Sequence, residues 1–524
     1  MKSEIKQPAP FFIFRTVFFI LAGLIFSQSA IYSINKDNIE KIQREFDNKT
    51  RRYVLKNGIR VILFQNKISP TIACYLKIGV GSANEPFDQA GTAHFLEHLL
   101  FKGTKKIGSS DFAKEELFLK EIEKLGNEMD FLSRQAADPL NDDKKRDQYQ
   151  IKISEIQKQM KIAEAGQRKF IISEEDSQAY SLAGQIGFNA YTTQDVTNYQ
   201  IKLPKNRLEL WAYMESERFL EPVFREFYQE RDVIQEERKM RFDSNPQAHL
   251  FELFNSTAFG MSPYGKPVIG YANNIPNLTL KDTQNFYNTF YIPSRMVITI
   301  SGDIEFDEAF KIIQKYFEAI PERPDSPFPP IKYTQPIGRK TAELVADHTP
   351  FMITGWIKPD VRHPDSPVYE ILSRILSDGQ NSRLVQKLVI QEKLAQNISA
   401  YSGIPAEKLE NQFAIMIAPY KEEDYFKIYD LLKTEVNDII QNGVAEPEIT
   451  RVKNRIYKEL VDSLNSNAGM ADQISYYELL LHDYKYLFTY LEKIQSITSK
   501  DIQRVAAATF IEKNNTTVWI KKGR

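Results

Sequence analysis

Two histidines and a glutamate stand close together in the stretch from Gly91 to Thr104. His94, Glu97 and His98 occupy positions i, i+3 and i+4, so on an α-helix their side chains project from one face. Two imidazoles on one face can bind a zinc ion, and a neighbouring carboxylate can take a proton from metal-bound water. The chain of 524 residues has only six histidines, and two of them fall in this pentapeptide. The pattern favours a metal site over a helix whose histidines merely pack or face solvent.

Strand patterns surround this helix. Residues 52–64 predict two strands joined by a turn at Asn57-Gly58, and residues 71–78 predict a third strand. A glycine-rich loop at 79–86 leads from the third strand into the helix. No Lys-Ser/Thr pair follows the glycines, which excludes a phosphate-binding loop.

Residues 111–165 interrupt the strand and helix pattern. Apolar residues recur there at alternating spacings of four and three in two runs, 118–132 and 149–163, with Asp138-Pro139 between them. Such spacing is typical of a coiled-coil seam, so we expect an antiparallel helical hairpin inserted in the domain. The hairpin is either a packed structural insertion or an arm that contacts a partner or guards a cleft.

A proline-rich stretch divides the chain. Five prolines between positions 321 and 330 predict an extended linker at 321–340. It separates a domain at 51–320 from a second domain at 341–524. Residues 31–50 are charged and poor in apolar side chains, so we expect them to be a spacer ahead of the first domain.

The second half repeats the first without its metal motif. A strand at 351–357 and a helix at 369–379 echo the strand and helix around His94. Superimposing Gly379 on Gly103 places Glu370, Ser373 and Arg374 at the positions of His94, Glu97 and His98. We therefore expect two copies of one α/β domain, with a metal site only in the first.

The first 30 residues have the pattern of a secretory signal peptide. Basic residues precede the apolar segment 16–26, and small and polar residues follow it. This segment is short for a membrane span of about 20 residues, although residues 11–26 together could serve as an uncleaved anchor. We expect an exported protein, periplasmic or extracellular.

The composition is that of a globular protein. Apolar residues make up 42% and the formal net charge is −1, so nothing indicates a nucleic-acid partner. The single cysteine, Cys74, lies in an apolar run and is expected to be a buried small hydrophobe rather than a nucleophile or a ligand.

The motif and its surroundings resemble a known family. The run from Gly91 to Thr104 is similar to the HxxEH motif of the pitrilysin and insulin-degrading-enzyme family of inverted zincins, in its mitochondrial-processing-peptidase-like, short-chain branch. Residues 81–82 match upstream of the motif, and further matching stretches follow in order: 189–192, 230–237, 263–267 and 382–384. The resemblance covers roughly residues 50–520, apart from the hairpin. It agrees with an α+β fold of two homologous α/β domains, each a mostly antiparallel sheet flanked by helices.

The resemblance implies one zinc ion per chain, held by His94, His98 and a distant glutamate. In the family that glutamate follows another by seven residues, the spacing of Glu230 and Glu237. Glu237 is therefore the expected ligand and Glu230 its support, since seven residues are two helical turns and both carboxylates share one face. The adjacent Glu236 stays open as a competing ligand.

The resemblance also implies peptide-bond hydrolysis with Glu97 as the general base. In the family, the strand that matches Asn189, Ala190, Tyr191 and Thr192 receives the substrate as an added β-strand, which favours peptides or unfolded segments. The sequence thus predicts a zinc metalloendopeptidase.

The sequence departs from the family at two positions. Members that act alone carry an arginine and a tyrosine that reach the substrate carbonyl, where this chain has Val389 and Gln396. Neither can donate the hydrogen bond that oxyanion stabilisation needs. We therefore expect a homologous non-metal subunit to supply the pair. Two alternatives stay open: a non-catalytic structural or assembly subunit, and a peptide-binding chaperone whose hairpin clasps its substrate.

Overall fold

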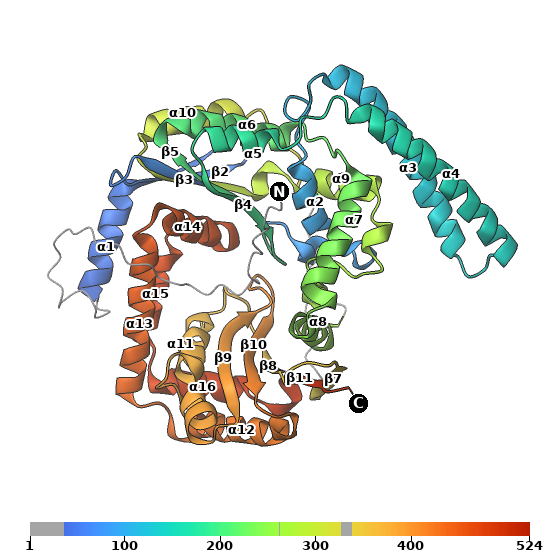
Figure 1. Cartoon of the computed structure of the whole chain (residues 1–524). Helices are drawn as coiled ribbons and strands as arrows, with labels where there is room; N and C mark the ends of the chain where they lie inside the picture. The colour runs from blue at the N-terminus through green and yellow to red at the C-terminus, as the bar shows by residue number, and fades with distance from the viewer. Residues whose placement is uncertain (1–35, 261, 326–337, 524) are drawn as a thin grey trace, which may run out of the picture.

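A computed structural model describes residues 36–260, 262–325 and 338–523 of the chain. These residues form two β-sheets flanked by helices, each sheet built from one half of the sequence (Figure 1). The expected α+β fold with two mostly antiparallel sheets is confirmed. The predicted signal segment at 1–30 lies outside the described residues, as do residues 326–337 of the predicted linker.

The first sheet has the strand order β1-β2-β6-β3-β5-β4. β2 and β6 are parallel, and all its other neighbouring strands are antiparallel. Its strands are β1 (Thr50–Val54), β2 (Arg60–Gln65), β3 (Thr71–Ile78), β4 (Ile186–Thr192), β5 (Thr197–Pro204) and β6 (Met296–Gly302). Within the described residues β4 pairs with β5 alone, so it is an edge strand.

The second sheet has the order β7-β11-β8-β10-β9 and repeats this plan without a counterpart of β1. β7 and β11 are parallel like β2 and β6, and the remaining pairs are antiparallel. Its strands are β7 (Lys340–Val345), β8 (Met352–Lys358), β9 (Ala395–Ile404), β10 (Asn411–Pro419) and β11 (Asn515–Lys521). The matching topology supports the interpretation of two copies of one domain.

The helices of the first half are α2 (Thr92–Leu100), α3 (Phe112–Ala137), α4 (Asp143–Gln167), α5 (Glu175–Leu182), α6 (Leu208–Leu220), α7 (Phe227–Arg238), α8 (Pro246–Phe259), α9 (Leu280–Phe290) and α10 (Phe306–Phe317). Those of the second half are α11 (Ser366–Ser377), α12 (Tyr425–Asn442), α13 (Glu446–Leu464), α14 (Asn467–Leu481), α15 (Tyr486–Ser496) and α16 (Ser499–Thr509). Along the described residues, no helix combines the length and apolarity needed to cross a membrane.

The two halves exchange one helix each. α8 belongs to the first half in sequence but packs on the second sheet, with Phe254 in one apolar cluster with Val518. α14 belongs to the second half but packs on the first sheet, where Ile474 shares a cluster with Ile62. Each sheet is therefore covered in part by the other half of the chain (Figure 1), which fixes the halves against each other.

The expected spacer at 31–50 is largely a helix. α1 (Lys36–Lys49) buries Ile39 and Phe46, and both lie in one cluster with residues of α14 and α15. Lys485 also pairs with Asp47 of α1 at 2.7 Å. The helix forms because its apolar residues Ile39, Ile42 and Phe46, at spacings of three and four, lie on one face. That face meets a partner surface more than 400 residues away in the chain, which local composition does not reveal.

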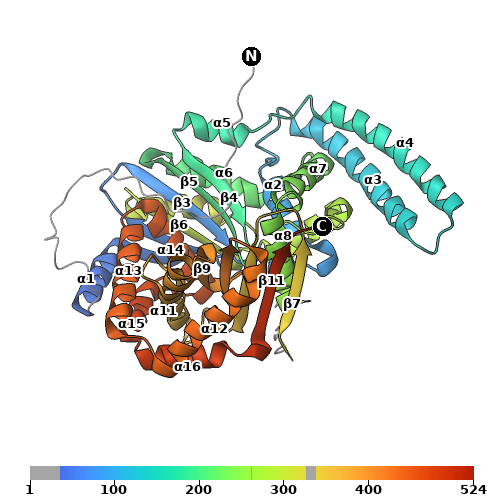
Figure 2. The ribbon, with the colours of Figure 1, turned by 60° about the horizontal axis from the view of Figure 1, so that its bottom comes forward.

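The predicted helical hairpin is confirmed as α3 and α4, which project from the body of the molecule in both views (Figures 1 and 2). Asp111 and Asp142 cap the two helices, because each carboxylate accepts a hydrogen bond from a backbone N–H three residues on. Leu125 and Ile156 lie in the buried seam. Cys74 is also buried as expected, in the core of the first sheet.

Candidate metal centre

The start of α2 is fixed from both sides. Gly91 caps the helix at a φ of 105°, and a Cβ there would lie 2.8 Å from the carbonyl oxygen of Ile269, so only glycine fits. The buried Glu85 carboxylate accepts hydrogen bonds from the backbone N–H groups of Gly91 at 2.9 Å and Ala93 at 2.7 Å. Burial raises the pKa of Glu85 above its usual value, although these two hydrogen bonds act to lower it, and the contacts orient the helix that carries the motif.

The structure brings His94, His98 and Glu237 together. The Nε2 atom of His94 lies 3.9 Å from Oε1 of Glu237, and Nε2 of His98 lies 3.6 Å from its Oε2. One potential ligand atom from each residue lies within 4.8 Å of the other two, and the described residues contain no second group of this kind. Two imidazole nitrogens and a carboxylate oxygen are the donor set of many catalytic zinc sites, so these residues fit the ion that the motif implies.

Glu236 points away from this group. Its carboxylate pairs with Lys239 at 2.6 Å, and its side chain is 67% exposed against 14% for Glu237. The adjacent positions differ because neighbouring residues on a helix diverge by about 100°. The geometry therefore favours Glu237 over Glu236 as the third ligand.

Glu230 supports His98 from behind. One carboxylate oxygen accepts a hydrogen bond from Nδ1 of His98 at 2.8 Å, and the other pairs with Lys102 at 2.6 Å. Burial opposes ionisation of Glu230, but the hydrogen bonds from His98 and Lys102 outweigh it and lower its pKa to about 2. A carboxylate held ionised in this way fixes the imidazole so that Nε2 faces the other ligands.

The histidines have opposite pKa shifts. Burial, with smaller contributions from the charges of His98 and Arg241, lowers the pKa of His94 to about 3. Burial also acts to lower the pKa of His98, but the hydrogen bond and charge of Glu230 raise it above its usual value. His94 is thus held neutral, the form in which an imidazole binds a metal.

Glu97 lies between the metal ligands and the edge strand. It is 7% exposed, and its Oε2 accepts a hydrogen bond from the hydroxyl of Thr192 at 2.5 Å. Burial raises the pKa of Glu97 to about 7, against the effect of the Thr192 hydroxyl, which lowers it. A carboxylate with a pKa near neutrality can accept and return a proton at physiological pH.

The predicted substrate strand is β4. Asn189, Ala190 and Tyr191 pair on one side with β5, and Thr192 ends the strand beside Glu97. The other side of β4 has no strand partner among the described residues. Its backbone groups can therefore pair with an added strand.

The equivalent place in the second half contains an ion pair. Glu370 and Arg374 of α11 are 2.7 Å apart, and Arg374 also contacts Glu459 at 2.8 Å. Of the two positions at which the sequence analysis expected an arginine and a tyrosine, Val389 packs partly buried against the core, and Gln396 is exposed on β9.

Two residues around the site escaped the sequence analysis: Lys102, which holds Glu230, and Arg241, which pairs with Glu237 at 2.8 Å. Thr192 was expected in the substrate strand, but the contact of its hydroxyl with Glu97 was not predicted. Arg241 follows Glu237 by four residues, a spacing at which side chains meet on a helix, so it could have been found from the sequence. The contacts of Lys102 and Thr192 depend on tertiary structure.

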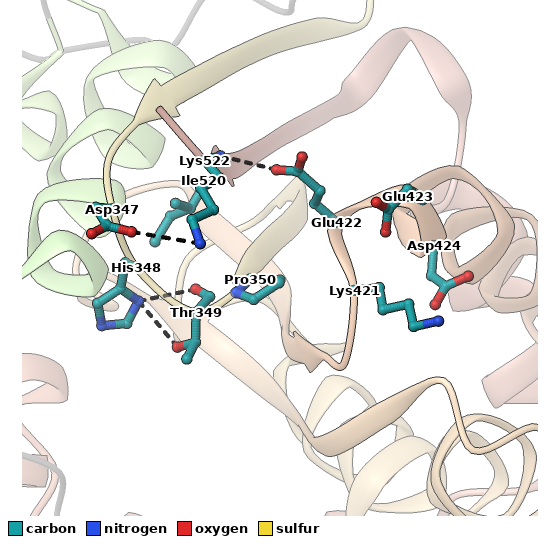
Figure 3. Close-up of a pocket in the computed structure, with 10 residues that line it drawn as sticks. All are labelled: Asp347, His348, Thr349, Pro350, Lys421, Glu422, Glu423, Asp424, Ile520 and Lys522. Carbon is teal, nitrogen blue, oxygen red and sulfur yellow. Dashed lines mark hydrogen bonds and ion pairs between the residues drawn. The ribbon is translucent and has the colours of Figure 1, made fainter. Parts of the chain in front are cut away.

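A separate hollow of about 870 Å³ lies in the second half and does not include the candidate metal ligands. Figure 3 shows its acidic residues, among them Glu422 and Asp424, which directly precede α12. Acidic groups at a helix N-terminus are stabilised by the helix dipole. Lys522 pairs there with Asp347 at 3.9 Å. These contacts give its acidic side chains a structural role.

Comparison with known proteins places this geometry in a family. Residues 60–162 and 175–271 match the family model described as insulinase, peptidase family M16. Residues 277–456 match the model described as the peptidase M16 inactive domain. The candidate metal ligands all lie in the first match, and the Glu370–Arg374 pair lies in the second.

Individual proteins of known family are also similar to this chain. The zinc protease PqqE of Helicobacter pylori is 25% identical over 481 residues, which are 90% of this chain and 93% of that protein. The probable mitochondrial-processing peptidase subunit beta of Arabidopsis thaliana is 22% identical over 510 residues, covering 89% of this chain and 77% of that protein. The crystal structure of a protease from Helicobacter pylori shares the fold with a TM-score of 0.74 and 23% identity, covering 90% of this chain and 99% of the other. The chain therefore belongs to the insulinase family, peptidase family M16.

Proposed function

We propose that the chain is a zinc-dependent endopeptidase that hydrolyses peptides or unfolded segments. One observation carries the proposal: donor atoms of His94, His98 and Glu237 lie within 4.8 Å of one another, next to a buried Glu97 that is hydrogen-bonded to an edge strand. The relative of Helicobacter pylori that is named a zinc protease supports it.

Each residue has a chemical role in this proposal. The bound zinc would polarise the scissile carbonyl and lower the pKa of the attacking water. Glu97 would accept the proton of that water and pass it to the leaving amine nitrogen. His94, His98 and Glu237 would hold the ion, and Glu230 would keep the His98 ring in orientation.

The substrate would bind along β4. An extended peptide that pairs with Asn189, Ala190, Tyr191 and Thr192 would bring its backbone next to Glu97. Backbone pairing places few demands on side chains, so the substrates would be extended peptides rather than folded proteins.

We further propose that a second chain completes the site. Val389 and Gln396 cannot supply the arginine and tyrosine that the family uses at the substrate carbonyl, and losing one such donor typically costs about 10²–10³ in rate. A relative named as a subunit of a processing peptidase supports a paired arrangement. The test is to purify the chain alone and together with a co-encoded homologue. Full activity of the lone chain would refute the second-chain proposal.

A non-catalytic subunit is the second candidate, favoured by those same two positions. Zinc content and hydrolysis of a quenched peptide library, each measured for the wild type and Glu97→Gln, separate the candidates. A peptidase binds zinc in both proteins and loses hydrolysis in the variant. A peptide-binding or structural subunit shows no hydrolysis in either, even with its homologue.

The proposed location is outside the cytoplasm. The pattern of basic, apolar and small residues within positions 1–30 supports export, with residues 11–26 as the segment that would anchor an uncleaved chain. Amino-terminal sequencing of the native protein distinguishes a cleaved signal from a retained anchor.

A further inference from the structure

Arg241 is an exposed cation that borders the candidate metal centre. It is part of a π-helical turn, Lys239–Asp243, that continues α7 beyond Glu237. Its Nη1 atom lies 2.8 Å from Oε1 of Glu237, and its side chain is 53% exposed. The positive charge of Arg241 therefore borders the metal site directly.

The side chains around the site differ in exposure. His94 is 13% exposed, Glu237 14% and His98 27%, so the three ligand residues are largely covered. Lys102, the cation behind Glu230, is 26% exposed and contacts no ligand carboxylate. Arg241 is thus the exposed cation that contacts a ligand carboxylate, so it is available to a substrate at the ligands.

The neighbouring cations cannot take this role. Arg238 is 5% exposed, and Glu252 and the carbonyl oxygen of Gly270 hold its guanidinium. Lys239 is exposed but pairs with Glu236, on the side of the helix away from the ligands. Arg241 has no such second partner among the contacts of the described residues.

The charge balance changes when a metal ion binds. In the protein alone, the guanidinium of Arg241 balances the carboxylate of Glu237. A divalent ion held by His94, His98 and Glu237 brings two positive charges to the same carboxylate, so the charge of Arg241 is then in surplus. An anionic group of the substrate can use this surplus, because a guanidinium pairs well with a carboxylate.

We infer that Arg241 determines specificity by recognising a carboxylate of the peptide close to the scissile bond. This inference rests on the proposed peptidase function and names a substrate class for it. The carboxylate comes from an aspartate or glutamate side chain or from the carboxyl terminus of the peptide. In this inference Arg241 selects the substrate. It does not replace the arginine and tyrosine that stabilise the oxyanion.

Two variants and a control test the inference. Arg241→Gln removes the charge and Arg241→Glu reverses it, while Lys239→Glu makes the same reversal on the same turn but away from the ligands. A peptide library digested by each protein, with its homologue present, is read by mass spectrometry for residues flanking the cleaved bonds. Wild type and Lys239→Glu should favour acidic residues by about five- to tenfold in kcat/KM. Arg241→Gln should lose the preference, and Arg241→Glu should favour lysine and arginine.

A binding measurement separates this inference from the proposed function. In a Glu97→Gln background loaded with zinc, fluorescence anisotropy compares a peptide containing glutamate with its glutamine counterpart, each with a free or an amidated carboxyl terminus. Preference for the glutamate or the free-acid form that disappears with Arg241→Gln supports the inference, and the two pairs tell the sources of the carboxylate apart.

The zinc content of the variants provides the last readout. Arg241→Gln should bind zinc more weakly, because losing a partner of a ligating carboxylate typically costs about 10–100-fold in metal affinity, so all proteins are compared at zinc concentrations that keep the site filled. Equal affinity for the acidic and neutral peptides, or an unchanged preference in both variants, would overturn the inference. A preserved binding preference without hydrolysis of any peptide would refute the peptidase and leave the role of Arg241 standing.

Discussion

The hydroxyl of Thr192 donates a hydrogen bond to Oε2 of Glu97 at 2.5 Å. Thr192 is the last residue of β4, and Glu97 stands between His94 and His98 on α2. This contact joins the proposed general base to the strand on which we expect the substrate to lie. A displacement of β4 would therefore change the position of the Glu97 carboxylate.

Replacing Thr192 by valine should shift the pH dependence of hydrolysis. The hydroxyl stabilises the carboxylate form and so lowers the pKa of Glu97, against burial, which raises it to about 7. Without the hydroxyl the pKa rises, and the acidic limb of the kcat/KM profile should move up by about one to two pH units. Thr192→Ser keeps the hydroxyl donor and should leave the acidic limb at its wild-type pH. An unchanged acidic limb in Thr192→Val would contradict the proposal that the Thr192 hydroxyl lowers the pKa of Glu97.

Removing Lys102 should weaken zinc binding. Lys102 pairs with Glu230, which orients the imidazole of His98. Loss of such an outer partner typically costs about 10–100-fold in metal affinity, so we expect a loss of this size for Lys102→Met in competition with a chromophoric chelator. The control is Lys105→Met, because Lys105 pairs with Glu221 at the surface. Equal zinc affinities of the two variants would refute the proposed effect of Lys102 on His98 through Glu230.

Arg225 should be important for the stability of the first domain. It is 1% exposed, pairs with the fully buried Glu115 of α3 and also donates to backbone carbonyl groups between Lys102 and Ile107. Breaking a buried ion pair on one side costs about 3–5 kcal/mol, so Arg225→Met should lower the free energy of unfolding by this amount in chemical denaturation. Adding Glu115→Leu should recover part of the loss; no recovery would show that the ion pair is not the cause.

Asp195 should hold the two halves together near the site. Its carboxylate, in the turn after β4, accepts hydrogen bonds from the hydroxyl of Tyr264 and from the backbone N–H groups of Glu407 at 3.1 Å and Lys408 at 2.9 Å. Asp195→Ala should therefore speed amide hydrogen exchange around Glu407 and Lys408, measured by mass spectrometry. Asp303→Ala removes an ion pair within the first half and should leave that exchange unchanged; equal exchange in wild type and Asp195→Ala would contradict the prediction.

Much of the fold follows from local sequence patterns. The spacing in residues 111–165 predicts the hairpin because each apolar seam is visible within one helix. Strands such as β3 are recognisable from β-branched and apolar residues between turn signals. Residues 208–238 form two helices, α6 and α7, separated at residues 221–226, and helical periodicity alone does not show this break.

Contacts between distant segments could not be predicted in this way. An apolar helix face indicates burial but does not identify the surface that covers it, so the exchange of α8 and α14 and the packing of α1 were not foreseen. The motif His94-Phe-Leu-Glu-His98 predicts its own geometry because all its members lie on one helix. Glu237 required the family resemblance, and the partner of Glu97 required the structure.

The most direct test of the account compares the wild type with Glu97→Gln. Both proteins are prepared in the same way with the homologue present, and the zinc content per chain and the rate of peptide hydrolysis are measured for each. Glu97 is not among the three ligands but adjoins them, so the account predicts one zinc ion in both proteins. It predicts hydrolysis by the wild type and a near-complete loss in the variant, since glutamine cannot accept the proton. Hydrolysis by Glu97→Gln at the wild-type rate, or a wild-type chain that binds no zinc, would contradict it.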